Sequence, residues 1–123
     1  MESSGGGSII NHEGLQRLRQ ETGAGFQRVL ALFLKNFPDR LIALNEAWHK
    51  QDRALLRQTA HKLKGTSATF CADSFSHLCA QLESSAEEGS AEGVAEILLR
   101  IEKEGEFVRK ELQDLLLLAL AGE

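Results

Sequence analysis

The chain has 123 residues, a formal net charge of −4, and 42% hydrophobic and 26% charged residues. Its length fits one domain, and its acidic balance argues against a nucleic-acid partner, because proteins that bind nucleic acid normally carry a basic surface. A single proline and no tyrosine, in a chain rich in Leu, Ala and Glu, favour helix over sheet. Cys71 and Cys79 are too few for a disulfide framework, so we expect reduced, buried thiols in a cytoplasmic protein.

The first eight residues, MESSGGGS, have the composition of a flexible tag or linker, and we assign residues 9–123 to the domain. No basic segment followed by an apolar one marks a signal peptide. The longest apolar run, residues 115–121, is far shorter than the roughly 20 residues of a membrane span. We therefore expect no direct membrane contact.

Capping residues and apolar periodicity predict a short first helix and a longer second one. Asn11 begins the first helix, and Gly23 ends it. The second helix starts near Ala24, and Pro38 must kink it or begin a new helix before the pattern resumes at Leu41. Its apolar stripe consists of Phe26, Val29, Leu30, Phe33 and Phe37.

Three further helices follow. Asp52 is the predicted cap of a helix that runs to about Phe70, Asp73 caps the next, which stops at Gly89, and Ser90 opens the last. The predicted fold is all-α, an antiparallel up-down four-helix bundle with an additional short N-terminal helix. The apolar run at residues 115–118 is expected to pack on the first helix. We expect a monomer, although a weak dimer contact through that run stays open.

The segment TAHKLKGTS, residues 59–67, holds the most informative side chains. On a helical wheel Leu63 points to the core and His61 lies nearly opposite it. The core face is completed by Leu56, Thr59, Ala60, Ser67 and Phe70. The outer face around His61 is built mainly from small residues and includes Gly65, and its predicted partner-docking residues are Ala54, Arg57, Gln58 and Ala68.

These residue types suit phosphoryl transfer. A neutral imidazole such as that of His61 is a nucleophile near pH 7, and a transferring phosphoryl group needs in-line access and compensation of its negative charge. Lys64 supplies the charge, and Gly65 leaves the space although glycine weakens a helix. Glu83, on the next antiparallel helix, is the predicted acceptor for the second ring nitrogen of His61.

The segment AHKLKGTSATFCADSFSHLCAQLE resembles the signature of histidine phosphotransfer (HPt) domains, and the resemblance covers residues 11–118. It implies that His61 is phosphorylated, that Lys64 and Gly65 assist, and that Glu83 bonds the imidazole. The chain departs from the family pattern at Thr66, where a small Ser or Ala is usual, and at Cys71, where Gly is frequent.

The resemblance implies a phosphorelay intermediate that takes a phosphoryl group from the aspartate of one receiver domain and passes it to another. The partners are then receiver domains of response regulators and of a hybrid histidine kinase. The chain is either a free protein or the C-terminal domain of a hybrid sensor kinase, cytoplasmic in both cases. It has no Gly-rich phosphate loop between a strand and a helix, so we expect no kinase activity of its own. No cofactor is expected, and Mg²⁺ belongs to the partner receiver alone.

Two other functions stay open. A helical adaptor could dock a receiver without carrying phosphate, in which case His61 would be replaceable. A metal-binding bundle could use Cys71, His77 and Cys79, although their spacing lacks the paired pattern of zinc sites.

Overall fold

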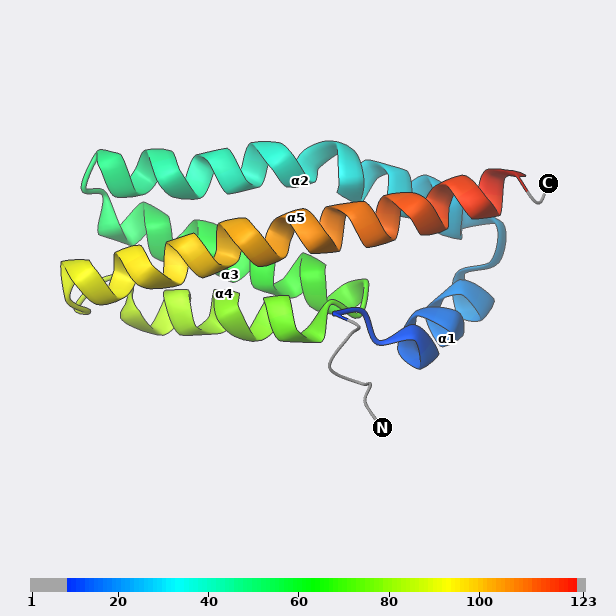
Figure 1. Ribbon diagram of the computed structural model, residues 1–123, viewed down its shortest axis with the longest axis horizontal. Helices are drawn as coiled ribbons and strands as arrows, with labels where there is room; N and C mark the ends of the chain where they lie inside the picture. The colour runs from blue at the N-terminus through cyan, green and yellow to red at the C-terminus, as the bar shows by residue number, and fades with distance from the viewer. Residues whose placement is uncertain (1–8, 122–123) are drawn as a thin grey trace.

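The computed structural model describes residues 9–121, and the segment predicted to be a tag or linker, residues 1–8, lies outside them (Figure 1). The described chain is helical and contains no strand. Its elements are α1 (His12–Thr22), the short 3₁₀ helix η1 (Gly23–Gly25), α2 (Phe26–His49), α3 (Arg53–Thr69), α4 (Asp73–Ser85) and α5 (Ala91–Ala121).

The four long helices form an antiparallel up-down bundle, and α1 lies across one end of it (Figure 1). Around the bundle α2 contacts α3, α3 contacts α4, α4 contacts α5, and α5 returns to α2. Within the described residues no Cα atom of α3 lies within 8 Å of a Cα atom of α5, so the two helices occupy diagonal corners. The predicted fold class is confirmed.

Three predicted helix caps are present. The side chains of Asn11, Asp52 and Ser90 accept hydrogen bonds from backbone N–H groups three residues ahead, at 3.1, 3.0 and 3.0 Å. Gly23 ends α1 with a φ of 62°, a left-handed conformation that glycine adopts without steric cost. The second helix continues through Pro38, so no new helix begins there.

The predictions for the two ends of α4 were wrong. Ala72 occupies the cap position, because its methyl group is buried in the core, and Asp73 is the first helical residue, where its charge still favours the helix dipole. The helix ends at Ser85 rather than at Gly89. A turn over residues 86–89 follows, in which the Gly89 N–H donates to the Ser85 carbonyl at 2.7 Å.

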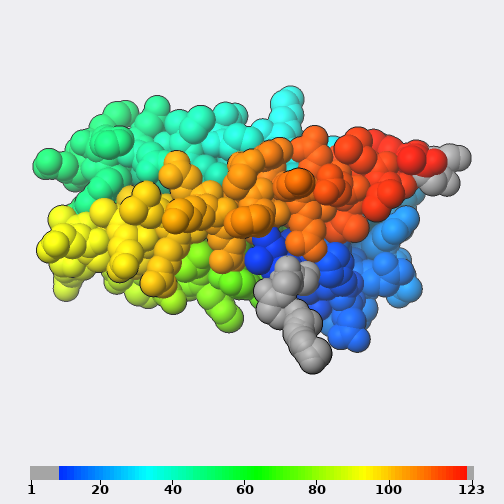
Figure 2. All heavy atoms as spheres, viewed as in Figure 1, coloured from blue at the N-terminus to red at the C-terminus, as the bar shows by residue number. Residues whose placement is uncertain are grey.

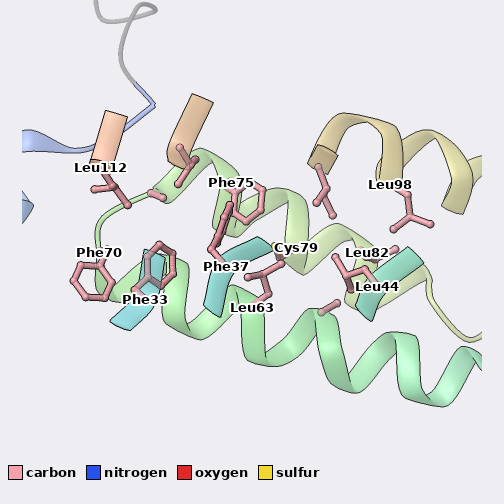
Figure 3. Close-up of a cluster of buried hydrophobic side chains, with 14 of the residues drawn as sticks. Phe33, Phe37, Leu44, Leu63, Phe70, Phe75, Cys79, Leu82, Leu98 and Leu112 are labelled. Carbon is pink, nitrogen blue, oxygen red and sulfur yellow. The ribbon is translucent and has the colours of Figure 1, made fainter. Parts of the chain in front are cut away.

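Aromatic rings fill the middle of the bundle (Figure 3). Phe37 contacts Phe33 and Phe75, with ring centroids 5.2 and 5.4 Å apart. Gly105 of α5 is buried against them, and a Cβ there would lie 3.3 Å from Phe75 Cε1 and 3.2 Å from Leu41 Cδ1. A side chain at this position would therefore push α5 away from the rings.

The two cysteines are free thiols in different surroundings. Cys79 is buried, and burial, helped by the nearby Glu104 charge, raises the pKa of its thiol to about 12. Cys71 is only half-buried, so the prediction of a buried thiol was wrong for this residue. It lies in the turn before α4 with a φ of 62°, and its carbonyl accepts a hydrogen bond from the Asn11 N–H at 2.8 Å.

Among residues 9–121, no helix combines the length and the apolar character needed to cross a membrane.

Candidate functional site

Helix α3 presents His61 to solvent because the opposite side of the helix is anchored in the core. Four of its side chains are buried, at Leu56, Ala60, Leu63 and Ser67. The His61 side chain is 63% exposed. The helical wheel therefore placed the imidazole correctly, and only Thr59, half-buried rather than in the core, departs from the prediction.

Glu83 of α4 joins the imidazole to the lysine that follows it one turn later. Its Oε2 lies 2.8 Å from His61 Nδ1, and its Oε1 lies 2.8 Å from Lys64 Nζ. The predicted contact between Glu83 and His61 is present. The second contact was not predicted, because the sequence had assigned Lys64 only to an incoming group. One carboxylate thus fixes two side chains of α3.

The charge on Glu83 determines how the imidazole is protonated. The hydrogen bond from Lys64, followed by that from His61, holds the pKa of the Glu83 carboxyl below its usual value. An ionised carboxylate can only accept hydrogen bonds, so Nδ1 of His61 carries the ring proton. The lone pair is then on Nε2, at the edge of the ring away from Glu83. Nε2 is the nucleophilic atom of this arrangement.

Gly65 lies exposed inside α3, one turn beyond His61. A Cβ at this position would meet no described atom within 4 Å, apart from the backbone of its own helix, and its backbone is not in the left-handed region. Packing and conformation therefore give no reason for a glycine here, although glycine costs about 1 kcal/mol relative to alanine in a helix. What Gly65 provides is open surface beside the imidazole.

The predicted docking residues surround His61, but they differ in exposure and in whether they already bind a neighbouring side chain. Ala54, Gln58 and Ala68 are exposed. Arg57 is half-buried, and its Nε lies 3.3 Å from Glu87 Oε1. Arg57 therefore already forms an ion pair with Glu87, in the turn that follows α4. The sequence did not predict this contact.

A groove between α2 and α3 continues the exposed face on the α2 side of His61. Its volume is about 210 Å³. Val29 and Leu32 at its edge are 44% and 57% exposed, and Phe70 lies in its wall. The sequence analysis had included Val29 in the apolar stripe of the second helix, but its side chain is exposed. The available signal was its spacing, since Val29 and Leu32 are three residues apart and share one flank of the helix.

Comparison with known proteins agrees with this arrangement. The model of the Hpt domain family matches residues 28–119. The chain belongs to the Hpt domain family. Hpt domains are phosphotransfer components of two-component phosphorelays, which gives the exposed imidazole a chemical context.

Individual relatives of this Hpt domain come from several bacteria. Phosphorelay protein LuxU of Vibrio vulnificus strain YJ016 is 30% identical over 84 residues, which cover 68% of this chain and 73% of LuxU. Histidine-containing phosphotransfer protein B of Pseudomonas aeruginosa PAO1 matches with a TM-score of 0.82 and 26% identity, over 88% of this chain and 94% of that one.

A second solved structure, the HPT domain of a sensor hybrid histidine kinase from Shewanella, has a TM-score of 0.73 and 21% identity, over 88% of this chain and 93% of that one. At this identity the likeness concerns the fold alone.

Within residues 9–121, no group of three or more His, Cys, Asp or Glu side chains is arranged to hold a metal ion. Cys71, His77 and Cys79 accordingly form no such group.

Proposed function

We propose that His61 of this Hpt domain receives a phosphoryl group from the aspartyl phosphate of one receiver domain and delivers it to the aspartate of another. In the first step the Nε2 lone pair attacks phosphorus, the N–P bond forms, and the bond from phosphorus to the aspartate oxygen breaks, leaving a carboxylate. The second step is the reverse reaction on a different receiver. The observation that carries this proposal is the bridge from Glu83 to His61 and Lys64.

Each neighbour of His61 has a separate role in this proposal. Glu83 keeps the proton on Nδ1, so Nε2 is available, and it stabilises the positive charge that the ring acquires when Nε2 is phosphorylated. Lys64 Nζ, held on the same side of α3, compensates the negative oxygens of the phosphoryl group. Gly65 lets the receiver approach in line with Nε2.

The receiver docks, in this proposal, over the exposed face of α3 and the adjoining α2–α3 groove. Ala54, Gln58 and Ala68 give a surface of small and polar side chains, and the exposed Leu32 adds apolar area next to it. The partners are receiver domains of response regulators and of a hybrid histidine kinase, and Mg²⁺ is held by the receiver. The domain needs no cofactor or ATP-dependent activity of its own, and it acts in the cytoplasm as a free carrier or as part of a hybrid kinase.

The decisive experiment is transfer of labelled phosphate from a phosphorylated receiver domain to the wild type, to His61→Gln, and to the matched control His49→Gln, which changes another exposed histidine. The wild type and the control are expected to acquire acid-labile, base-stable label, as a phosphohistidine requires, and His61→Gln none. Label on all three proteins would contradict the assignment of His61. Absence of label from the wild type, with binding to the receiver demonstrated, would favour an adaptor instead.

A further inference from the structure

Ser76 of α4 is bonded to the same lysine of α3 that Glu83 holds. Its Oγ donates a hydrogen bond to the backbone carbonyl of Lys64 at 3.0 Å, and the residue is only 8% exposed. The ammonium group of Lys64 lies 2.8 Å from Glu83 Oε1. Lys64 is therefore bound to α4 at both of its ends, through its carbonyl to Ser76 and through its side chain to Glu83.

The register of α4 explains why these two side chains reach one residue of α3. Ser76 and Glu83 are seven residues apart, close to two full turns of an α-helix, so they share one face of α4. Helix α4 packs against both α3 and α5, and Figure 2 shows α5 crossing the front of the bundle from yellow to red. The face that carries Ser76 and Glu83 is the one turned toward α3.

The hydroxyl of Ser76 crosses to another helix, whereas hydroxyls of α3 bond within their own. Thr66 and Thr69 donate to carbonyls three or four residues earlier in α3, which is the usual choice of a hydroxyl in a helix. Ser76 has the same option at the carbonyl of Ala72, four residues earlier, yet it donates to Lys64. An alanine would fill nearly the same space and need no partner. What the serine adds is the link to α3.

This link meets α3 where the helix is intrinsically weak. Gly65 directly follows Lys64, and glycine leaves the backbone more conformational freedom than any other residue. Thr66 and Ser67 come next, and both are weaker helix formers than Ala or Leu. A carbonyl oxygen has two lone pairs, so that of Lys64 accepts the Ser76 hydroxyl in addition to a helical N–H. The bond adds a restraint to α3 and replaces none.

The backbone link matters because the side-chain link can be exchanged during transfer. The Lys64 ammonium group lies on Glu83 in this structure, and it must reach the phosphoryl oxygens when His61 reacts. A lysine side chain is a flexible four-carbon stem, so the place of its charge depends on where its backbone is held. The hydroxyl of Ser76 holds that backbone whichever partner the ammonium group takes.

We propose that Ser76 is a positioning residue for phosphoryl transfer: it holds the backbone of α3 at Lys64 and thereby fixes the reach of Nζ to the transferring group. This role rests on the proposed transfer to His61. The sequence gave no sign of it, because Ser76 lies 12 residues after Lys64 and on another helix. Loss of the hydroxyl should slow transfer only while the Lys64 side chain is present.

A double-mutant cycle on the initial rate of transfer from a phosphorylated receiver tests this role. Ser76→Ala alone is expected to lower the rate about tenfold, because a misplaced group contributes less to the reaction. In a Lys64→Ala background the same change is expected to alter the rate by less than about twofold, since the side chain that Ser76 positions is absent. A purely structural role would lower the rate by the same factor in both backgrounds.

Ser74→Ala is the matched control, since it makes the same change at an exposed position of α4. It is expected to transfer like the wild type, and circular dichroism should show that all variants are folded at the assay temperature. The role of Ser76 is overturned if Ser76→Ala transfers like the wild type, or if it loses the same factor with and without Lys64. Absence of label from the wild type overturns the proposed function and this role with it, so the two failures are distinguishable.

Discussion

Two polar clusters join α3 to the α4 side of the bundle, and they are built differently. At the start of α3, Arg53 Nη1 donates to the Gly89 carbonyl at 2.7 Å, and its guanidinium lies over the Trp48 ring, 5.1 Å from the centroid. Further along, Glu83 holds His61 and Lys64 through side chains only. The first cluster binds backbone carbonyl groups of the loop, whereas the second positions two reactive side chains.

The comparison shows what distinguishes a structural polar cluster from a functional one in this fold. Arg53 also lies 3.5 Å from the carbonyls of Ala86 and Glu87, so its donors are used by the loop before α5. In the second cluster the nucleophilic Nε2 of His61 remains uncommitted. We therefore expect changes to the first cluster to reduce stability and changes to the second to reduce transfer.

Lys64→Ala should give the largest effect on transfer. Loss of a positioned charge at the phosphoryl group is expected to lower the initial transfer rate about 100-fold, measured with a phosphorylated receiver. The melting temperature should change little, because a partly exposed ion pair contributes under about 1 kcal/mol. Lys62→Ala, on the other flank of the exposed face, is the control. An equal loss of rate in both variants would indicate a general effect of surface charge.

Arg53→Met tests whether the cluster around Arg53 contributes to stability rather than to transfer. The change removes the hydrogen bonds to the loop and the contact with Trp48, so the free energy of unfolding should fall by about 2 kcal/mol. Urea denaturation measures this loss, with Arg28→Met, an exposed arginine of α2, as the control. Transfer measured well below the melting temperature should remain near the wild-type rate. A large loss of transfer in the folded variant would mean that the Arg53 cluster also contributes to phosphoryl transfer.

Gly65→Ala should change stability and transfer in opposite directions. The free energy of unfolding is expected to rise by about 1 kcal/mol, because alanine is the better helix former and its Cβ meets open space. The transfer rate should fall at least tenfold, since the methyl group obstructs the approach to Nε2. Ala31→Gly, at an exposed position of α2, calibrates the helix effect with the opposite sign. A stabilised variant with unchanged transfer would remove Gly65 from the site.

The smallest effect concerns the pH dependence of stability. The pKa of Glu83 is lower in the folded protein than its ordinary value of about 4.3, so its stabilising contribution is complete above that pH. That contribution is lost as the pH falls through the folded-state pKa. Glu83→Gln should therefore be less stable than its parent near pH 6, and the difference should disappear on acidification. Measuring both in a His61→Gln background removes the titration of the imidazole.

Much of this arrangement could be predicted from the sequence because it depends on local rules. The apolar period of α3 fixes the direction of His61, and the caps at Asn11, Asp52 and Ser90 fix the starts of three helices. The contact with Glu83 followed from its place on the next antiparallel helix, one position past the core residue Leu82. These predictions use only spacing along a helix and the connection to the next one.

The predictions from sequence fail where tertiary packing, rather than local spacing, determines the structure. Val29 fits a helical stripe but is exposed, because periodicity does not say which neighbour covers a face. Ala72 takes the cap position from Asp73 because the core needs its methyl group. The left-handed backbone of Cys71 is not indicated by the cysteine itself, and the sequence analysis did not draw it from the glycine that is frequent at this position in the family. Nor did the sequence show that Lys64 bonds to Glu83, since one carboxylate binds two side chains through its two oxygens.

The diagonal placement of α3 and α5 also limits how the domain can be regulated. Allosteric control is a coupling free energy between two sites, and it needs an element with two arrangements that both sites can bias. Within the described residues the two helices have no Cα atoms within 8 Å of each other, and the packed rings of Phe33, Phe37 and Phe75 fill the core of the bundle. Any influence of a ligand on α5 on the reactivity of His61 should therefore pass through α2 or α4, which both pack against the two helices, and of these α4 carries Glu83.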